Sequence, residues 1–249
     1  MSMSLTTTKE WNCKLDTIKT RAIVLSSIDY KEKDKFVTLF SLEYGLITAK
    51  LKSVKASTAK LKFAKEPFCF GEFIIQKPAN VITSVEVIDT FYDVTKSLEK
   101  FYNACAIVEI VKKAVQEGET NQPLFVSTLK ALGTICYENK QDYALVKFMV
   151  EILEAMGYQF TLDKCSECGQ DFLNKKWLNL DYGEIVCNAC KSQNCVEISN
   201  KCHSALKILK NTEYEKLKTI NLAKGSEKEC LEILTLNFKN RFNIDIKLI

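Results

Sequence analysis

Two pairs of cysteines constrain this chain more than any other feature of its sequence. Cys165 and Cys168 form one CxxC pair, Cys187 and Cys190 form the other, and 18 residues separate the two pairs. Two residues between the cysteines of a pair let one tight turn direct both sulfurs at a single ion, and this spacing is typical of a four-cysteine zinc ribbon. Gly169 follows the first pair and allows the positive φ that such a turn needs. The sequence therefore predicts a zinc ribbon over residues 162–193, with one Zn²⁺ ion.

Four cysteine ligands fill the coordination shell of zinc and leave no position for water, so we expect a structural ion rather than a catalytic one. The apolar residues between the pairs predict a hairpin that turns at 181–183. A redox role or two disulfides are the alternatives for these cysteines, although a thioredoxin-like site needs one pair in a βαβ context. Cys195, Cys202 and His203 follow closely and are either a second metal site or an ordinary helix start.

The number of cysteines also bears on the cellular compartment of the protein, because disulfides form in oxidising compartments and thiols stay reduced in the cytoplasm. The chain has 249 residues and 11 cysteines, an odd number. Residues 1–19 contain no apolar core and no small-residue cleavage site, so they do not resemble a signal peptide. No stretch of sequence approaches the 18 apolar residues of a membrane span. We therefore expect reduced thiols in a cytoplasmic protein.

Charge is distributed unevenly along the chain. Residues 1–65 contain 13 Lys and Arg against 6 Asp and Glu, whereas residues 66–249 contain 22 against 25, so a net charge of +4 combines +7 with −3. Such asymmetry favours nucleic acid or another polyanion as a partner of the N-terminal part.

The N-terminal third is predicted to be a small β-barrel. Five segments are rich in β-branched and aromatic residues and are separated by turn signals: Arg21–Asp29, Phe36–Phe40, Leu46–Val54, Phe68–Gln76 and Val81–Thr90. Five short strands within one domain favour an OB-fold, whose loops and one face commonly hold single-stranded nucleic acid. We place this domain at residues 18–92, after an N-terminal extension over 1–17.

Helical periodicity begins after residue 95 and predicts a helical domain over 93–249, with the ribbon inserted in it. The first helix is expected to bury one apolar stripe, formed by Leu98, Phe101, Cys105, Val108 and Val115. Further helices are predicted over 124–137, with Pro123 in the first turn, over 143–156, ended by Gly157, and over 203–210. Ser226 and Glu229 fit a capping box before a last helix. The fold class is α+β, with an OB barrel, a helical bundle and a zinc ribbon.

Six lysines form the second chemical signal. They occur within 16 residues that contain no acid, in the third predicted strand and the loop after it: Lys50, Lys52, Lys55, Lys60, Lys62 and Lys65. They are either a surface that binds nucleic acid or a solvated lysine-rich face. With 33 Lys and only 2 Arg in the chain, we expect binding that is largely independent of base sequence. Four nearby aromatic residues either stack on bases or, for the phenylalanines, fill the barrel core: Tyr30, Phe36, Phe40 and Tyr44.

Nothing in the sequence predicts an enzyme. His203 is the only histidine, and neither a serine nucleophile motif nor paired catalytic carboxylates accompany it. Walker A and GxGxxG patterns are also absent from the sequence. No catalytic residue is proposed.

Several short motifs together resemble a known family. Ala22–Leu25 is followed by Asp29-Tyr30, Asp34 and Phe36–Phe40, and Gly45, Ala49, Lys50 and Pro67-Phe68 continue the same order. Gly157-Tyr158 lies eight residues before Cys165, and Cys168-Gly169, Cys187 and Cys190 follow. In order and spacing, these residues resemble the bacterial RecO family of recombination mediators in DNA repair, over residues 20–200.

The resemblance implies a nucleoid-associated protein without enzymatic activity that binds single- and double-stranded DNA. It also implies annealing of complementary strands coated by the single-stranded-DNA-binding protein SSB, through the tail of SSB, and assistance to RecA loading together with RecR. It places the charges of the family's basic loop on Lys52, Lys55 and Lys60, whereas Ser53, Ala56 and Leu61–Phe63 depart from the family pattern. The alternative is an OB-fold and zinc-ribbon accessory factor in RNA metabolism.

Overall fold

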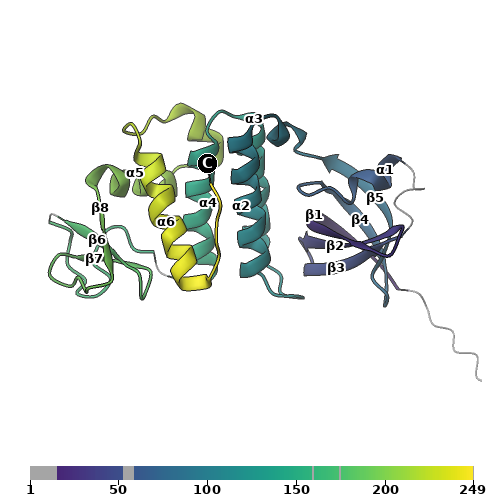
Figure 1. Cartoon of the computed structure of the whole chain (residues 1–249), viewed down its shortest axis with the longest axis horizontal. Coiled ribbons are helices and arrows are strands. Elements are labelled where there is room, and N and C mark those ends of the chain that lie inside the picture. Colours follow the sequence, from purple (N-terminus) through teal and green to yellow (C-terminus); the bar gives the residue numbers. More distant parts are fainter. Residues whose placement is uncertain (1–15, 53–58, 159, 174, 249) are drawn as a thin grey trace, which may run out of the picture.

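The protein is elongated, with a barrel at one end, helices in the middle and a small sheet at the other end (Figure 1). The computed structural model describes residues 16–52, 59–158, 160–173 and 175–248. Its elements, in chain order, are β1 (Thr17–Tyr30), β2 (Asp34–Ser41), β3 (Gly45–Leu51), α1 (Ala59–Phe63), β4 (Phe70–Gln76), β5 (Val81–Asp89), η1 (Tyr92–Lys96), α2 (Leu98–Ala114), α3 (Gln122–Tyr137), α4 (Gln141–Ala155), β6 (Lys176–Asn179), β7 (Glu184–Cys187), β8 (Cys195–Ile198), α5 (Asn200–Asn211), η2 (Tyr214–Thr219) and α6 (Ser226–Phe242).

The five N-terminal strands close into a barrel in the order β1-β2-β3-β5-β4, as predicted. Neighbouring strands are antiparallel except β3 and β5, which pair in parallel at Lys50 and Val81. Several boundaries differ from the prediction. β1 begins at Thr17 rather than Arg21, and β2 begins at Asp34 rather than Phe36. β4 begins at Phe70, because Phe68 has a φ of 73° and cannot continue a strand. β3 ends at Leu51, and the rest of its predicted range is outside the described residues, apart from Lys52.

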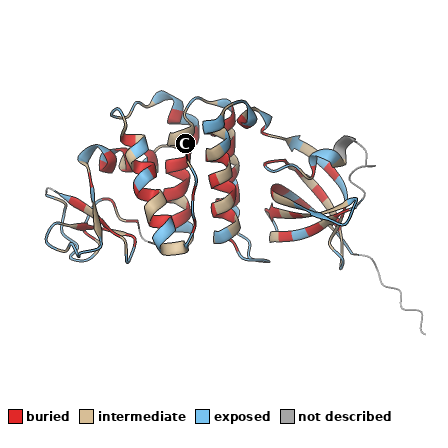
Figure 2. Ribbon diagram, in the orientation of Figure 1, coloured by how far each residue is buried: buried red, intermediate tan, exposed pale blue. Residues whose placement is uncertain are grey.

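The apolar run of β1 is buried on both faces. Ala22 and Val24 point into the barrel core, whereas Ile23 and Leu25 belong to the core of the helical part. Side chains of a strand alternate between faces, so a strand covered on both sides shows a continuous apolar run. Figure 2 shows the resulting burial in the barrel strands and in the helices of the middle layer.

Aromatic side chains join the barrel to the helices. Phe40, fully buried, lies edge-on to Phe125 of α3 with ring centroids 5.4 Å apart, and Phe70 lies 6.2 Å from the same ring. Phe40 is therefore a core residue at the junction rather than a free stacking platform. Beside this contact, the loop after α2 forms isolated bridges from Glu117 to Gly45 and to Leu46, the strand partner of Phe40.

The predicted apolar stripe of α2 is wrong in its first turn. Leu98 is 70% exposed and Phe101 is 39% exposed, whereas the buried face runs through Ala104, Ile107 and Val111. Leu98 and Phe101 lie outside this buried face, and the ring of Phe101 lies 6.1 Å from that of Phe68. Val108 and Val115 are buried and Cys105 is partly buried, in line with the prediction.

The predicted helix ends are correct where a glycine or proline sets them. Pro123 lies in the first turn of α3. After α4, Gly157 has a φ of 81°, its N–H donates to the carbonyl of Glu154, and the N–H of Tyr158 donates to Leu153. These two bonds form a Schellman motif, which satisfies the last carbonyls of the helix.

The predicted capping box at α6 is wrong. The helix is preceded by Gly225 in a left-handed conformation, and the hydroxyl of Ser226 is buried without a hydrogen-bond partner in the described residues. Glu229 instead accepts hydrogen bonds from the N–H and hydroxyl of Ser199, at 3.0 and 2.7 Å. Ser199 is itself the N-cap of α5. The carboxylate of Glu229, predicted to cap its own helix α6, thus links α6 to the start of α5 instead.

The C-terminal sheet has the order β7-β6-β8, and all its pairs are antiparallel. The predicted hairpin is β6 and β7, with a turn at Asp181–Gly183, whereas β8 and the short helix α1 were not predicted. Within the described ranges, none of the helices has the length and apolar character needed to cross a bilayer.

Candidate metal centre and nucleic-acid interface

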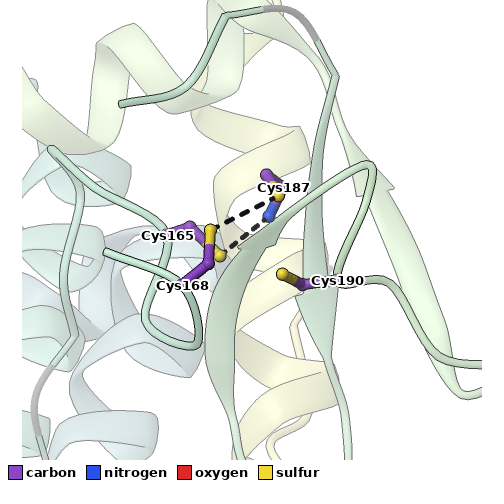
Figure 3. A group of neighbouring side chains, drawn as sticks. All are labelled: Cys165, Cys168, Cys187 and Cys190. Carbon is purple, nitrogen blue, oxygen red and sulfur yellow. Dashed lines mark hydrogen bonds between the residues drawn. The ribbon is translucent and has the colours of Figure 1, made fainter. Parts of the chain in front are cut away.

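The four cysteines of the two CxxC pairs converge on one point between two loops (Figure 3). Their sulfur atoms all lie within 4.8 Å of one another, and Cys168 Sγ and Cys187 Sγ are 3.9 Å apart. In a regular tetrahedron around an ion at the usual zinc–sulfur distance, sulfurs lie about 3.8 Å apart. The arrangement therefore fits a single tetrahedral metal ion.

Backbone geometry produces this convergence. Gly169 has a φ of 71° and its N–H donates to the carbonyl of Cys165, which closes the first turn. In the second turn, the N–H of Cys190 donates to the carbonyl of Cys187. The N–H of Cys187 also donates to Cys165 Sγ at 3.3 Å, which connects the two turns. Each turn therefore presents two sulfurs, as the spacing predicts.

The electrostatics of the four thiols also suit a cation. Burial would raise the pKa of the Cys165 thiol, but hydrogen bonds from the backbone N–H groups of Cys168, Cys187 and Glu167 outweigh this and lower it to about 7. The pKa of Cys190 is raised instead, first by the hydrogen bond with Cys187 and then by burial. Cys165 thus ionises readily while Cys190 resists further negative charge, and a bound divalent cation would favour the thiolate form. Tetrahedral sites with four sulfurs suit zinc or iron.

The three-stranded sheet packs on the helices beside it. Leu178, Ile185 and Ile198 are buried and belong to the core of the helical part. Polar contacts reinforce the docking: the amide of Asn237 in α6 donates to the carbonyl of Gly183, and Lys176 Nζ donates to Asn200 Oδ1 at 2.9 Å. The ribbon therefore has one face on α5 and α6 rather than a core of its own.

The nearby residues that were candidates for a second metal site have other contacts. His203 Nε2 lies 2.7 Å from the carbonyl oxygen of Leu162, and burial lowers the pKa of its ring. The thiol of Cys202 lies 3.3 Å from that of Cys230, inside the contact of α5 and α6. Cys195 accepts a hydrogen bond from the N–H of Ser192. Among the described residues, only the four ribbon cysteines form a group that can hold a metal.

The six lysines of the basic segment have different surroundings. Lys50 is half-buried on β3 and pairs with Asp34 at 2.9 Å, and Lys65 pairs with Glu66 at 3.4 Å. Lys52 and Lys62 are exposed. Lys60 lies in α1, but its side chain and the whole of Lys55 are outside what the structure describes.

The structure adds lysines that the linear segment did not include. The turn between β1 and β2 lies beside α1, so Lys33 and Lys35 share a concavity of about 310 Å³ with Lys62 and Lys65. Acids line it as well, namely Asp29, Glu32 and Asp34, and Lys35 pairs with Asp29 at 2.7 Å. The lysine-rich turn at 31–35 is visible in the sequence, but its proximity to residues 62–65 depends on barrel closure.

The fold and the site define a class of protein: an OB-type barrel joined to a helical domain that carries a four-sulfur metal site. Barrels of this type commonly bind oligonucleotides. Comparison with known families is more specific, because the family described as Recombination protein O N terminal matches residues 15–91 and the one described as Recombination protein O C terminal matches residues 95–247. The chain therefore belongs to the RecO family of DNA repair proteins.

Individual relatives agree with this assignment over most of their length. The chain is 30% identical to the DNA repair protein RecO of Clostridium kluyveri over 229 residues, which cover 89% of this chain and 88% of the relative. It is 28% identical to the RecO of Clostridium novyi, with 89% and 88% covered, and 28% identical to that of Caldanaerobacter subterraneus, with 92% and 95% covered.

Proposed function

We propose that this protein binds single- and double-stranded DNA through its barrel and anneals complementary strands coated by SSB. In this proposal it acts in recombinational repair, where it works with RecR to load RecA. The supporting observation is the closed five-stranded barrel, on which four lysines from two separate segments line one concavity: Lys33, Lys35, Lys62 and Lys65. Membership of the RecO family supports a role in DNA repair rather than in RNA metabolism.

The mechanism is electrostatic and involves no bond chemistry. Two DNA strands repel each other through their phosphates, and lysines that neutralise both strands lower this repulsion, so complementary sequences meet and pair more often. Exposed lysines such as Lys52 and Lys62 are available for phosphates, whereas Lys50 and Lys65 exchange an acid partner for a phosphate. Because Lys50 and Lys65 must first give up an ion pair, each gains less binding free energy from a phosphate than an unpaired lysine would.

For the acidic, apolar-ended tail of SSB, we propose the groove between α3, α4 and η2. It has a volume of about 430 Å³ and an apolar wall that includes Leu124, Val126 and Ala155. Its three glutamates are each paired with a lysine: Glu151 with Lys147, Glu154 with Lys210 and Glu213 with Lys216. At its rim, Lys130 pairs with Glu215 on the surface, at 2.9 Å, and an incoming carboxylate can replace this partner. Val126→Glu is expected to abolish binding of a peptide with the tail sequence while binding of DNA is retained, because none of the barrel lysines lines this groove.

For the four-cysteine centre, we propose one structural Zn²⁺ ion held by Cys165, Cys168, Cys187 and Cys190. The convergence of both CxxC pairs on one point supports this over a redox site or two separate disulfides. Metal analysis of protein purified without chelator tests it. About one equivalent of zinc is expected, whereas iron in its place, or metal-free protein with readily oxidised dithiols, would contradict it.

The annealing of SSB-coated complementary strands tests the central proposal. Wild-type protein should accelerate it, and a protein that binds RNA but fails in this assay would belong to the alternative class. Lys52→Glu combined with Lys55→Glu should weaken DNA binding several-fold and flatten the log–log salt dependence on single strands by about 1.4, at roughly 0.7 per phosphate contact.

Lys224→Glu combined with Lys228→Glu is the matched control, since both residues are exposed lysines near the start of α6. This double variant changes the net charge by the same amount but outside the barrel, so it should keep most of the affinity for DNA. Equal losses for the two double variants would show that only the total charge matters.

A further inference from the structure

The outer face of β1, β2 and β3 carries apolar and aromatic side chains that the barrel core does not use. Val37 and Leu39 of β2 point into the core, so Phe36 points outward. Strand register places Ile28 of β1 and Lys50 of β3 directly beside Phe36. Tyr30 lies two residues from Ile28 on the same strand, so the two side chains share this face. Ile28 is 64% exposed and Tyr30 is 37% exposed.

Tyr30 and Phe36 form an aromatic pair on this face. Their ring centroids are 4.6 Å apart and the planes are inclined by 53°. Each ring holds the other in place, so an incoming flat group meets a surface that is already ordered. Phe36 is half-buried and Tyr30 is exposed, and this outward-facing pair adds little to a barrel whose interior is already filled by Phe73, Leu39 and Ile75.

Two ammonium groups lie over the Tyr30 ring. Lys50 Nζ is 4.9 Å from the ring centroid and Lys31 Nζ is 5.4 Å from it. The N–H of Lys50 also donates to the carbonyl of Asn80, so Tyr30 lies near the β4–β5 turn as well as the β1–β2 turn. In OB barrels, these two loops and the face of strands 2 and 3 bind oligonucleotides.

The charge around the face suits an anionic ligand. Within and beside it are the lysines at 31, 33, 35, 50 and 52 and the acids at 29, 32 and 34. Lys31, Lys33 and Lys52 are exposed. A ligand with flat, weakly polar groups at regular spacing on an anionic backbone matches both the rings and the lysines, and single-stranded nucleic acid has this chemistry.

We propose that Tyr30, supported by Phe36, is a base-stacking platform that selects single-stranded over double-stranded DNA. One unpaired base stacks on the Tyr30 ring, and Lys31 and Lys50 leave the ring for the flanking phosphates. A duplex keeps its bases stacked on each other and cannot use the platform. The inference rests on the proposed DNA-binding function and adds the residue that distinguishes the two forms of DNA.

Binding of a labelled oligothymidylate of about 16 nucleotides, the upper site size of one OB-fold, tests this. Tyr30→Leu should weaken binding at least about fivefold, since stacking on one base contributes about 1–3 kcal/mol. Tyr30→Phe keeps the ring and should bind within about twofold of wild type. Because leucine and tyrosine are both uncharged, the salt dependence should stay the same, and binding to a duplex should be unaffected.

Two controls separate stacking from a general effect. Tyr92→Leu removes a tyrosine that is 68% exposed in η1, and it should bind the oligonucleotide as wild type does. An abasic oligonucleotide of the same length carries the same phosphates without bases, so wild type and Tyr30→Leu should bind it equally.

Each remaining outcome has a distinct meaning. Equal binding of oligothymidylate by wild type and Tyr30→Leu would overturn the platform while the DNA-binding function stands. Equal weakening on the abasic strand or on duplex would also overturn it, since the loss would then not depend on unpaired bases. Wild-type protein that binds none of these DNAs would overturn the proposed function itself.

Discussion

The barrel and the ribbon are both small β-sheets, but they are stabilised in different ways. The barrel is closed and encloses a core of its own, made only of residues between Ala22 and Val85. The ribbon has three strands of four residues each, and its buried side chains Leu178, Ile185 and Ile198 belong to the helical core. A closed sheet with its own core leaves no strand edge unpaired, whereas strands this short need a metal, a docking partner or both.

The comparison indicates where each region is vulnerable. Loss of a barrel core side chain should affect the barrel as a whole, because its strands share one interior. Loss of the metal should affect the ribbon and the surfaces of α5 and α6 under it, through the contacts of Gly183 with Asn237 and of Lys176 with Asn200. The predictions below test this separation, from the largest expected effect to the smallest.

Removal of the metal by a strong chelator should have the largest effect. Structural zinc sites contribute about 10–16 kcal/mol of folding free energy in isolated peptides, so the ribbon amides should lose their protection from hydrogen exchange while the barrel amides keep theirs. Trp177 on β6 reports the same change by fluorescence in a Trp11→Phe background, which leaves one tryptophan.

Cys168→Ser should reproduce the effect of the chelator, and Cys105→Ser is its control. Cys105 lies partly buried in α2, outside the four-cysteine group, and its replacement should leave the metal content unchanged. Simultaneous loss of protection in ribbon and barrel after chelation would show that the two regions are one cooperative unit.

Phe73→Ala should have the next largest effect. Phe73 is fully buried in the barrel core, and truncation of a buried phenylalanine costs about 3–5 kcal/mol. Urea unfolding measures this. The cost should be the same with and without metal, because distant sites that share no partners contribute additively to stability. A cost that depends on metal would mean that barrel and ribbon are coupled through the helices.

Local sequence signals predicted much of both regions. The spacing of the cysteines, the positive φ at Gly169 and the end of α4 at Gly157 all depend on neighbours in the chain, and all three agree with the structure. Strand and turn composition likewise predicted the five barrel strands and the ribbon hairpin, because β-branched runs and turn residues act locally.

The sequence-based predictions fail where contacts between residues far apart in the chain determine the local structure. Glu229 has the right spacing for a local cap, yet Ser199 competes for its carboxylate from 30 positions away. Leu98 and Phe101 have helical spacing, but both are exposed, because the face of α2 that packs on the other helices runs through Ala104, Ile107 and Val111 instead. The lysines at 33 and 35 meet those at 62 and 65 only because the barrel closes. None of these contacts can be predicted from residues that are neighbours in the sequence.

Gly45→Ala should destabilise the junction of barrel and helices. Gly45 has a φ of 65°, and a Cβ built there would overlap the backbone carbonyl of Glu119 in the loop after α2. Gly118→Ala is the matched control, since its φ is 76° but no atom lies within 4 Å of the added Cβ. The control should cost about 1–2 kcal/mol for the left-handed conformation alone.

The difference in unfolding free energy between the two variants, measured with urea, therefore reports the close approach of Gly45 to the Glu119 carbonyl. Gly45→Ala is expected to cost clearly more than Gly118→Ala. If both cost the same, the loop moves away freely, and the contact between barrel and helices at this edge is loose.

The smallest effect should come from His203, which lies under the ribbon and donates to Leu162 as a neutral ring. Burial lowers its pKa in the folded state, so the unfolded chain takes up a proton first as the pH falls. Its contribution to stability is therefore fully present above the ordinary histidine pKa of about 6.5 and decreases below it. His203→Gln keeps a donor for the Leu162 carbonyl but does not titrate.

Acid also releases metal from cysteine thiolates, so the useful quantity is the difference in unfolding free energy between wild type and His203→Gln as a function of pH. Metal release occurs in both proteins and cancels. Because His203 is the only histidine in the chain, any remaining slope between neutral pH and the metal-release range belongs to its ring. A parallel pH dependence of the two proteins would show that His203 takes up a proton as easily in the folded chain as in the unfolded one, and that the contact between α5 and the ribbon opens without cost.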